Sequence, residues 1–178
     1  MKNIEVEARS FISKEQYERL KEYFHNNAQF VKEDKQETVY FDCDQDLRIQ
    51  KNDFYAKIWL KKGSLHDDCR EELEIKFDKD DFVNLEKLFG ELGYKTEIKW
   101  YRKRLEFDWD DIKVCLDDTK GYGYIIELEK MANEDEKDKE FDNLVERMKS
   151  LDVEITSKGE FQRKFTEYKD SWKLLTEE

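Results

Sequence analysis

Three short segments carry paired glutamates with one residue between them, and these pairs are the clearest sign of chemistry in the chain. The pairs are Glu5 and Glu7, Glu72 and Glu74, and Glu127 and Glu129. Apolar residues alternate with the acids, so each pair lies on one face of a strand and the apolar residues lie on the other. If these faces meet inside a closed sheet, they form a hard-cation site, because Mg²⁺ and Mn²⁺ prefer oxygen ligands.

Basic residues alternate in the same way in the segments between the acids. The rows that share a face are Arg48 and Gln50; Lys57, Trp59 and Lys61; Arg102, Arg104 and Glu106; and Lys113, Cys115 and Asp117. Arg binds phosphate through two parallel hydrogen bonds and Lys supplies a point charge, whereas a metal ion bridges phosphate oxygens and offsets their repulsion. Acidic and basic strands together favour binding of a metal–phosphate complex.

A second interpretation of this pattern is that each charged face is the solvated side of an ordinary sheet. One Glu-x-Glu pair carries little weight in a chain with 45 acidic residues. Trp59 favours an enclosed face, because a large aromatic between two lysines is unusual on a solvated strand, although packing under a loop or helix also explains it. The residue pattern alone leaves both interpretations open.

Length and composition predict a single folded domain over residues 1–178. Charged residues make up 44% of the chain, but the 12 Phe, 9 Tyr and 4 Trp are too many for a solvated coil. The chain has no proline and only 6 scattered glycines, so nothing marks a linker between domains.

Charge and cysteine usage limit the partners and the compartment. A net charge of −12 argues against nucleic acid or an anionic membrane as a partner, because the field of the protein repels both. No apolar run is long enough to span a membrane, and the N-terminus lacks a signal-like region. The three cysteines have no Cys-x-x-Cys spacing, which is typical of free thiols in a reducing compartment. We therefore expect a cytoplasmic protein, either a monomer or a homodimer.

Four helices are expected between the strands. Ser13 and Gln16 form a capping box before the first, Gly93 ends the second, the charged stretch 133–140 opens the third, and a C-terminal helix follows from residue 161. Segments 5–9 and 72–76 both carry two acids and a base on one face and both lead into a helix. This internal similarity predicts a pseudo-symmetric antiparallel sheet of two halves.

The order of these motifs resembles that of the CYTH superfamily, the triphosphate tunnel metalloenzymes. The family includes class IV adenylyl cyclases, thiamine triphosphatases and inorganic triphosphatases, and its Glu-x-Glu-x-Lys signature is similar to Glu5-Val-Glu-Ala-Arg9. The resemblance continues along nearly the whole chain through Val39–Asp42, Asp46–Gln50, Trp59–Lys61, Arg70–Glu74, Leu92–Tyr94, Arg102–Arg104, Leu116–Asp117, Gly121–Glu129 and Arg163–Phe165.

The resemblance implies an α+β fold, a closed eight-stranded antiparallel β-barrel that forms a tunnel, with helices packed outside. It implies that Mg²⁺ or Mn²⁺ is held by the acids Glu5, Glu7, Glu72, Glu74, Asp117, Glu127 and Glu129, with catalysis by Glu5, Glu7, Arg9, Glu127 and Glu129. It places the triphosphate against Arg48, Lys61, Lys76, Arg102, Arg104 and Arg163. Trp59 is our candidate for stacking on a ligand ring.

Two positions depart from the family pattern. Arg9 stands where the signature has Lys, and Gln50 stands where an Arg-x-Arg pair would have its second base. Arg9 keeps the charge but cannot titrate near neutrality. The departures affect how water is positioned and how one phosphate is held.

The expected function is metal-dependent hydrolysis of a phosphoanhydride bond in a small-molecule triphosphate: tripolyphosphate, a nucleoside triphosphate such as ATP, or thiamine triphosphate. The first alternative is conversion of ATP to cyclic AMP and pyrophosphate, and the second is a non-catalytic triphosphate-binding module, which Arg9 and Gln50 would favour. The chain lacks the motifs of a Ser–His triad and of a P-loop. The segment His66-Asp-Asp-Cys69 is a weaker candidate for a transition-metal site.

Overall fold

A computed structural model describes residues 4–61 and 72–177, and of Lys61 and Glu72 it describes the backbone alone. These residues form eight strands and four α-helices, an α+β fold. The strands are β1 (Ile4–Ile12), β2 (Gln29–Asp42), β3 (Asp46–Lys51), β4 (Ala56–Lys61), β5 (Glu72–Phe77), β6 (Lys95–Trp109), β7 (Ile112–Thr119) and β8 (Gly123–Ala132). The segment His66–Cys69 lies outside the described residues.

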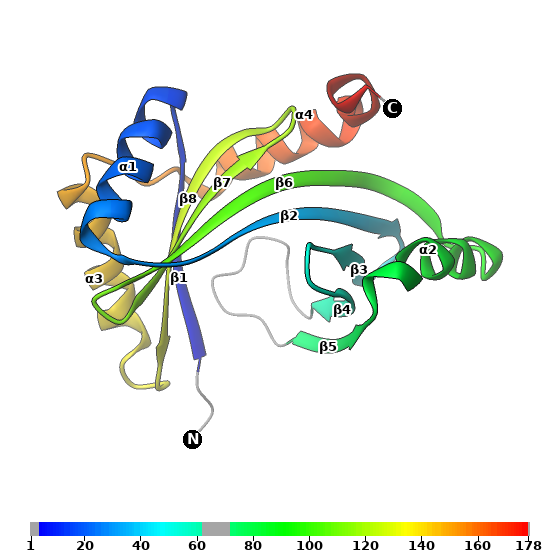
Figure 1. Cartoon of the computed structure of the whole chain (residues 1–178), viewed down its shortest axis with the longest axis horizontal. Helices are drawn as coiled ribbons and strands as arrows, with labels where there is room; N and C mark the ends of the chain where they lie inside the picture. The colour runs from blue at the N-terminus through cyan, green and yellow to red at the C-terminus, as the bar shows by residue number, and fades with distance from the viewer. Residues whose placement is uncertain (1–3, 62–71, 178) are drawn as a thin grey trace.

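All eight strands form one antiparallel sheet in the order β1-β8-β7-β6-β2-β3-β4-β5. The long central strands β2 and β6 run through the whole molecule as a curved arch that joins the two halves (Figure 1). The two segments that resemble each other in sequence, β1 and β5, form the two edges of this sheet. The predicted antiparallel sheet is therefore confirmed, and its pseudo-symmetry stays a prediction.

The closed barrel is not confirmed. Strands β1 and β5 stand at opposite ends of the strand order, and among the described residues no hydrogen-bonded ladder joins them. The physical reason lies in the pairing of the central strands: β2 pairs with β6 over nearly its full length but with β3 only from Glu37 to Tyr40. Since no strand among residues 4–61 and 72–177 pairs with the first half of β2 on that side, the sheet is curved but open there.

Two helices cover the apolar outer face of the half that contains β1, β8 and β7. Helix α1 (Lys14–Asn27) begins at the predicted capping box, in which Ser13 Oγ accepts from the Gln16 amide at 3.1 Å. It buries Leu20 and Phe24 completely, and α3 (Lys137–Ser150) adds Leu144 and Met148 to the same core. Since the outer faces of these strands are apolar and covered, their charged faces must point to the other side of the sheet.

The remaining helices cover the other half and one side of the arch (Figure 1). A 3-10 turn (Lys79–Asp81) leads into α2 (Phe82–Glu91), and Gly93 follows it with the positive φ of 92° that a helix end favours. Helix α4 (Lys158–Thr176) packs on β6, where Tyr168 donates to the Lys99 carbonyl oxygen at 2.7 Å. The four predicted helices are therefore all present.

Candidate active site

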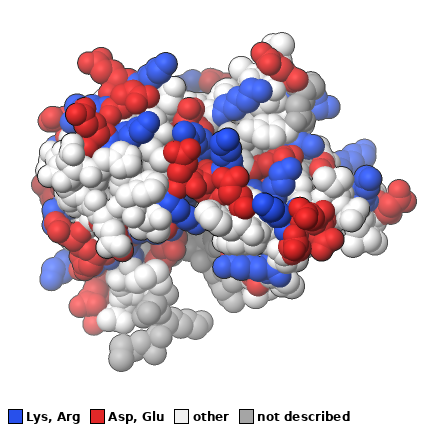
Figure 2. Space-filling view, viewed as in Figure 1, with Lys and Arg blue, Asp and Glu red and all other residues white. Residues whose placement is uncertain are grey.

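The charged faces of the strands enclose one cavity of about 380 Å³. This volume is in the range of small-molecule sites. Of the described residues, seven acids and six bases line it, together with polar and aromatic residues: Glu5, Glu7, Asp34, Glu74, Glu106, Glu127 and Glu129; Lys32, Arg48, Lys57, Arg102, Arg104 and Lys113; and Gln36, Gln50, Asn52, Tyr55 and Trp59. Basic and acidic groups also lie side by side at the centre of the face in Figure 2.

Strand register brings these side chains together. Asp34 lies opposite Arg104 across β2 and β6, Arg104 lies opposite Asp117 across β6 and β7, and Cys115 lies opposite Glu127 across β7 and β8. Residues directly opposite each other in an antiparallel pair point to the same side of the sheet. Acids are therefore concentrated over β1, β8 and β7, and bases over β6 and β3.

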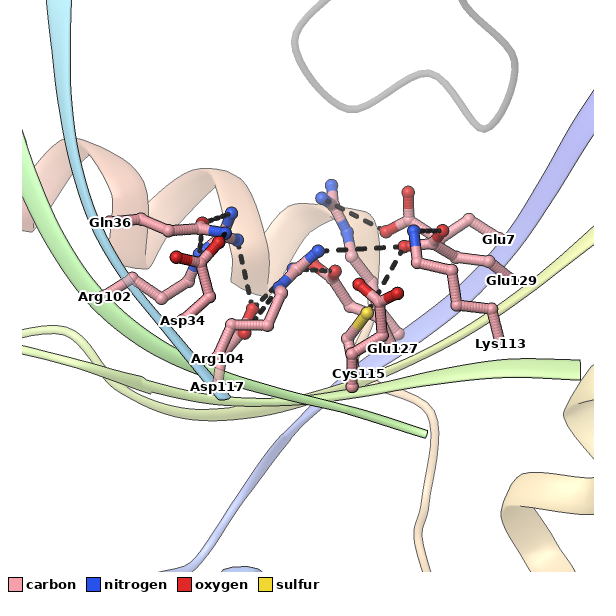
Figure 3. A network of polar contacts seen from close by, with 12 residues as sticks. Glu7, Asp34, Gln36, Arg102, Arg104, Lys113, Cys115, Asp117, Glu127 and Glu129 are labelled. Atoms are coloured by element: carbon pink, nitrogen blue, oxygen red, sulfur yellow. Dashed lines mark hydrogen bonds and ion pairs between the residues drawn. The ribbon is translucent and has the colours of Figure 1, made fainter. Parts of the chain in front are cut away.

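A chain of hydrogen bonds runs along the cavity floor from β2 to β7 (Figure 3). Gln36 accepts from Arg102 at 2.9 and 2.6 Å, and Arg102 Nη1 donates to Asp117 at 3.0 Å. Arg104 donates two bonds to the carboxylate of Asp117, at 2.8 and 2.7 Å. This arrangement fixes both guanidinium groups, because Asp117 is 1% exposed and holds them from below.

The floor continues from Arg104 into the acidic part of the cavity. Arg104 donates to Glu127 and lies 3.9 Å from Glu129 Oε1, while Lys113 donates to Glu129 Oε2 at 2.5 Å. Figure 3 shows these side chains rising from the sheet toward the same side. Acids and bases alternate along the whole floor, so each buried charge has a partner of opposite sign.

Glu7 is the least compensated acid of this group. Its Oε1 is buried and accepts no hydrogen bond within the described part of the chain, although Arg9 Nη1 lies 3.6 Å away. Burial, together with the neighbouring carboxylate of Glu127, raises the pKa of Glu7 from 4.5 to about 7. In the metal-free protein, burial therefore favours the protonated form of Glu7.

Glu127 has the opposite electrostatic environment. Burial alone would raise the pKa of this carboxyl, but Arg104, Arg102 and Arg9 together lower it to about 2. Glu127 is therefore ionised at any physiological pH, and the cation beside it is the Arg104 guanidinium.

These two environments predict opposite effects of removing charge in the metal-free protein. Because the pKa of Glu7 is raised, its ionisation lowers the stability of the fold as pH rises from 4.5 through 7. Glu7→Gln should therefore raise the free energy of unfolding at pH 8 by about 1–2 kcal/mol. This gain is smaller than a fully buried group would give. The lowered pKa of Glu127 means that its charge stabilises the fold above pH 4.5 and that this stability is lost toward pH 2. Glu127→Gln should therefore cost about 3 kcal/mol at pH 8.

Urea unfolding at pH 5 and pH 8 in the presence of EDTA measures both effects. The advantage of Glu7→Gln should shrink at pH 5, where folded Glu7 is protonated, whereas the cost of Glu127→Gln should persist there. Equal destabilisation by the two variants at pH 8 would show that these charges are wrongly assigned.

The opposite end of the cavity combines bases with aromatic rings. The Arg48 guanidinium donates two hydrogen bonds to Asp46, at 2.5 and 2.6 Å, and lies 4.3 Å from the Tyr40 ring centre and 5.7 Å from that of Trp59. Lys57 Nζ lies 4.3 Å from the Trp59 ring centre. Trp59 is only 5% exposed, so its ring is already packed among cations at the cavity wall.

Not every residue of the predicted site lies along this cavity. Arg163 is on α4 with a 59% exposed side chain and pairs with Glu167 of its own helix at 2.6 Å. Lys76 is 58% exposed and lies 3.5 Å from Glu74. Arg9 stacks on the Phe161 ring at 4.6 Å, beside the acidic end. The side chains of Lys61 and Glu72 lie outside the description, so their roles stay predictions.

Asp34 and Gln36 are site residues that the sequence interpretation missed. Asp34 is completely buried and accepts from Gln36 at 3.0 Å, and Gln36 orients Arg102. The sequence pattern that indicates them is the polar alternation Lys32-x-Asp34-x-Gln36, which places these side chains on the same face of the strand as the buried Thr38. Gln50, the departure from the expected base, donates to Thr38 Oγ1 at 2.9 Å and so supports this floor.

The acidic end has the donors that a divalent cation needs. Glu5, Glu7, Glu127 and Glu129 lie on adjacent strands and all line the cavity, and the buried Glu7 Oε1 accepts no hydrogen bond within the described residues. Carboxylate oxygens suit hard cations such as Mg²⁺ or Mn²⁺. These residues could therefore hold a metal.

Fold and site together define an antiparallel-sheet protein whose charged interior pairs an acidic, metal-competent end with a basic one. The CYTH domain model matches residues 3–160, and the chain belongs to the CYTH domain family. Among the described residues, none of the helices combines the length and the apolar character needed to cross a membrane.

Similar proteins are found by sequence and by structure. A Methanocaldococcus jannaschii protein named as a proposed adenylate cyclase is 32% identical over 136 residues, which cover 70% of this chain and 76% of that protein. A conserved hypothetical protein from Pyrococcus furiosus is 25% identical with a TM-score of 0.68, covering 84% of this chain and 91% of the other. A Hippeastrum protein, described as a proposed adenylyl cyclase with dominant triphosphatase activity, has a TM-score of 0.64 at 19% identity, covering 91% and 95% of the two chains, and shows the fold alone.

Proposed function

We propose that this protein is a metal-dependent enzyme that hydrolyses a phosphoanhydride bond of a small-molecule triphosphate inside the charged cavity. The observation that carries the proposal is the division of one cavity floor into an acidic end around Glu127 and Glu129 and a basic centre around Arg102 and Arg104. With seven acids and six bases, the lining is close to neutral. A triphosphate therefore has to enter together with divalent cations that offset its charge.

The residues that would hold Mg²⁺ or Mn²⁺ are Glu5, Glu7, Glu127 and Glu129. When bound there, the metal would offset the negative charge that develops in the transition state. Glu74 and Asp117, also predicted as ligands, are paired with Lys57 at 2.7 Å and with Arg102 and Arg104. In this proposal they orient bases instead.

The bases bind and align the phosphates. Arg102 and Arg104 have fixed planes because Gln36 and Asp117 hold part of each guanidinium group, and fixed forks suit phosphate geometry. Arg48 and Lys57 supply charge at the other end of the cavity. Arg104 is bonded to Glu127 in the metal-free protein, so neutralising Glu127 would release one of its donors toward the phosphate.

A carboxylate is also needed to accept a proton from the attacking water. Glu7 suits this task where Glu5, Glu127 and Glu129 hold the metal and leave its carboxylate free, because burial raises the pKa of Glu7 and so makes it a stronger base than an exposed glutamate. Arg9 beside it stays charged and so favours the ionised form of Glu7.

Two other functions remain as alternatives. The relative from Methanocaldococcus jannaschii favours cyclisation of ATP to cyclic AMP and pyrophosphate, since its name proposes a cyclase. A non-catalytic triphosphate-binding module is favoured by Gln50, which leaves one phosphate with one base fewer. Closure of the sheet into a tunnel, a cytoplasmic location and the absence of a nucleic-acid partner stay predictions.

Product analysis distinguishes these functions. The protein is incubated with Mg²⁺ or Mn²⁺ and with tripolyphosphate, ATP or thiamine triphosphate in separate reactions, and the products are resolved by ion-exchange chromatography. We expect orthophosphate from at least one substrate. Cyclic AMP with pyrophosphate would support the cyclase, and measurable binding without any product would support the module.

A further inference from the structure

Cys115 is a feature of the acidic end that the proposed function does not use. Its side chain is completely buried on the inner side of β7, directly opposite Glu127 on β8 and Glu106 on β6. Burial raises the pKa of the Cys115 thiol well above its usual range. A thiol adds little to a site for Mg²⁺, which prefers oxygen ligands.

The thiol nevertheless completes a set of three metal ligands. Cys115 Sγ and one carboxylate oxygen each from Glu127 and Glu129 all lie within 4.8 Å of one another. Cys115 Sγ lies 3.8 Å from Glu129 Oε1. With metal–sulfur and metal–oxygen bonds of about 2.3 and 2.1 Å, two ligands of a tetrahedral zinc site are about 3.6 Å apart.

A fourth acid lies on the neighbouring strand. Glu7 lies opposite Glu129 in the β1–β8 pair, and its buried Oε1 accepts no hydrogen bond among the described residues, although Arg9 Nη1 lies 3.6 Å away. A tetrahedral ion therefore finds a sulfur and two carboxylate oxygens within 4.8 Å of one another, with a third acid beside them. This mixed set matches ions that accept both sulfur and oxygen, whereas an all-oxygen site does not.

We propose that a thiophilic divalent cation, Zn²⁺ or Cd²⁺, binds to Cys115, Glu127 and Glu129 and thereby excludes the Mg²⁺ or Mn²⁺ that supports turnover. The ion takes the place of the thiol proton, which leaves to solvent, and it draws Glu127 and Glu129 away from Arg104 and Lys113. Inhibition of turnover rests on the proposed function, whereas binding of the ion does not.

Cadmium titration tests the binding directly, because a cadmium–thiolate bond absorbs in the ultraviolet and Mg²⁺ produces no such band. The sequence has two other cysteines, Cys43 and Cys69. The titration is therefore made in a Cys43→Ser/Cys69→Ser background, with and without Cys115→Ser, and thermal melting shows that each variant folds. We expect a one-to-one band in the background protein and its loss in Cys115→Ser.

The same proteins show whether the ion acts on turnover. The Cd²⁺ concentration that halves the Mg²⁺-supported rate, relative to each protein's own uninhibited rate, should rise about tenfold or more in Cys115→Ser. A band of unchanged size in Cys115→Ser, or equal inhibition of both proteins, would overturn the inference. If no protein hydrolyses a triphosphate but the band still depends on Cys115, the proposed function fails and the metal site stands.

Discussion

Glu127→Gln is expected to lower the rate of triphosphate hydrolysis by about a thousandfold or more. Glu127 lies between the acidic end and the basic centre, where it accepts from Arg104 and lies opposite Cys115 on β7. An amide cannot supply the negative oxygen that a divalent cation requires, so the charge of the transition state is no longer offset. Initial rates at saturating Mg²⁺ measure the loss, and circular dichroism shows that the variant is folded.

A surface glutamate provides the control. Glu134 has a 73% exposed side chain and pairs with Lys137 at 2.5 Å. Glu134→Gln removes the same charge without touching the cavity, so its rate should stay within about twofold of the parent. Glu7→Gln should lose activity like Glu127→Gln but gain stability at pH 8, which separates the two effects. Full activity in Glu127→Gln would instead favour the interpretation of the acids as a solvated face.

Arg104→Met should have the second large effect, on folding as well as on substrate binding. Arg104 is partner to Asp117, Glu127 and Glu129, and its removal takes from Glu127 the cation that donates to it and leaves Asp117 paired with Arg102 and Glu129 with Lys113. Breaking a buried ion pair by removing one partner costs about 3–5 kcal/mol. We expect this loss in urea unfolding at pH 8 and, in protein that remains folded, a raised KM for the triphosphate.

Arg163→Met is the matched control for this substitution. The Arg163 side chain is 59% exposed and pairs with Glu160 and Glu167 of its own helix. Its removal should change the free energy of unfolding by less than about 1 kcal/mol. A KM raised in Arg163→Met as much as in Arg104→Met would show that α4 moves Arg163 to the substrate. Unchanged stability in Arg104→Met would contradict the ion-pair network described for the floor.

The side chains on the inner and outer face of each strand could be predicted from the sequence, because they follow from the local alternation of charged and apolar residues. Val6 and Ala8 are buried on the outer side of β1, and Leu105 and Phe107 are buried on the outer side of β6. The charged residues that alternate with them on each strand must therefore point inward. The start of α1 was equally local, since Ser13 and Gln16 cap it within three residues. Such features need no knowledge of distant contacts.

Register and partner choice could not be predicted in this way. Asp34 lies opposite Arg104 because β2 and β6 pair over nearly their full lengths. This pairing joins residues about 70 positions apart in the chain, and local alternation does not specify it. Within the described part of the chain, the first half of β2 pairs with β6 alone, so the sheet is open on its other side. Lys76 and Arg163 match the family motif by position, yet their exposed side chains pair with nearby acids.

The central claim is that a metal held by the acidic end makes triphosphate hydrolysis possible. Phosphorus-31 NMR of a triphosphate that yields orthophosphate in the product analysis tests it most directly. The protein is followed with Mg²⁺, then with excess EDTA, and then with Mg²⁺ restored above the chelator. The account predicts that orthophosphate forms in the first stage, stops in the second and resumes in the third. Orthophosphate that forms at an undiminished rate in excess EDTA would contradict it.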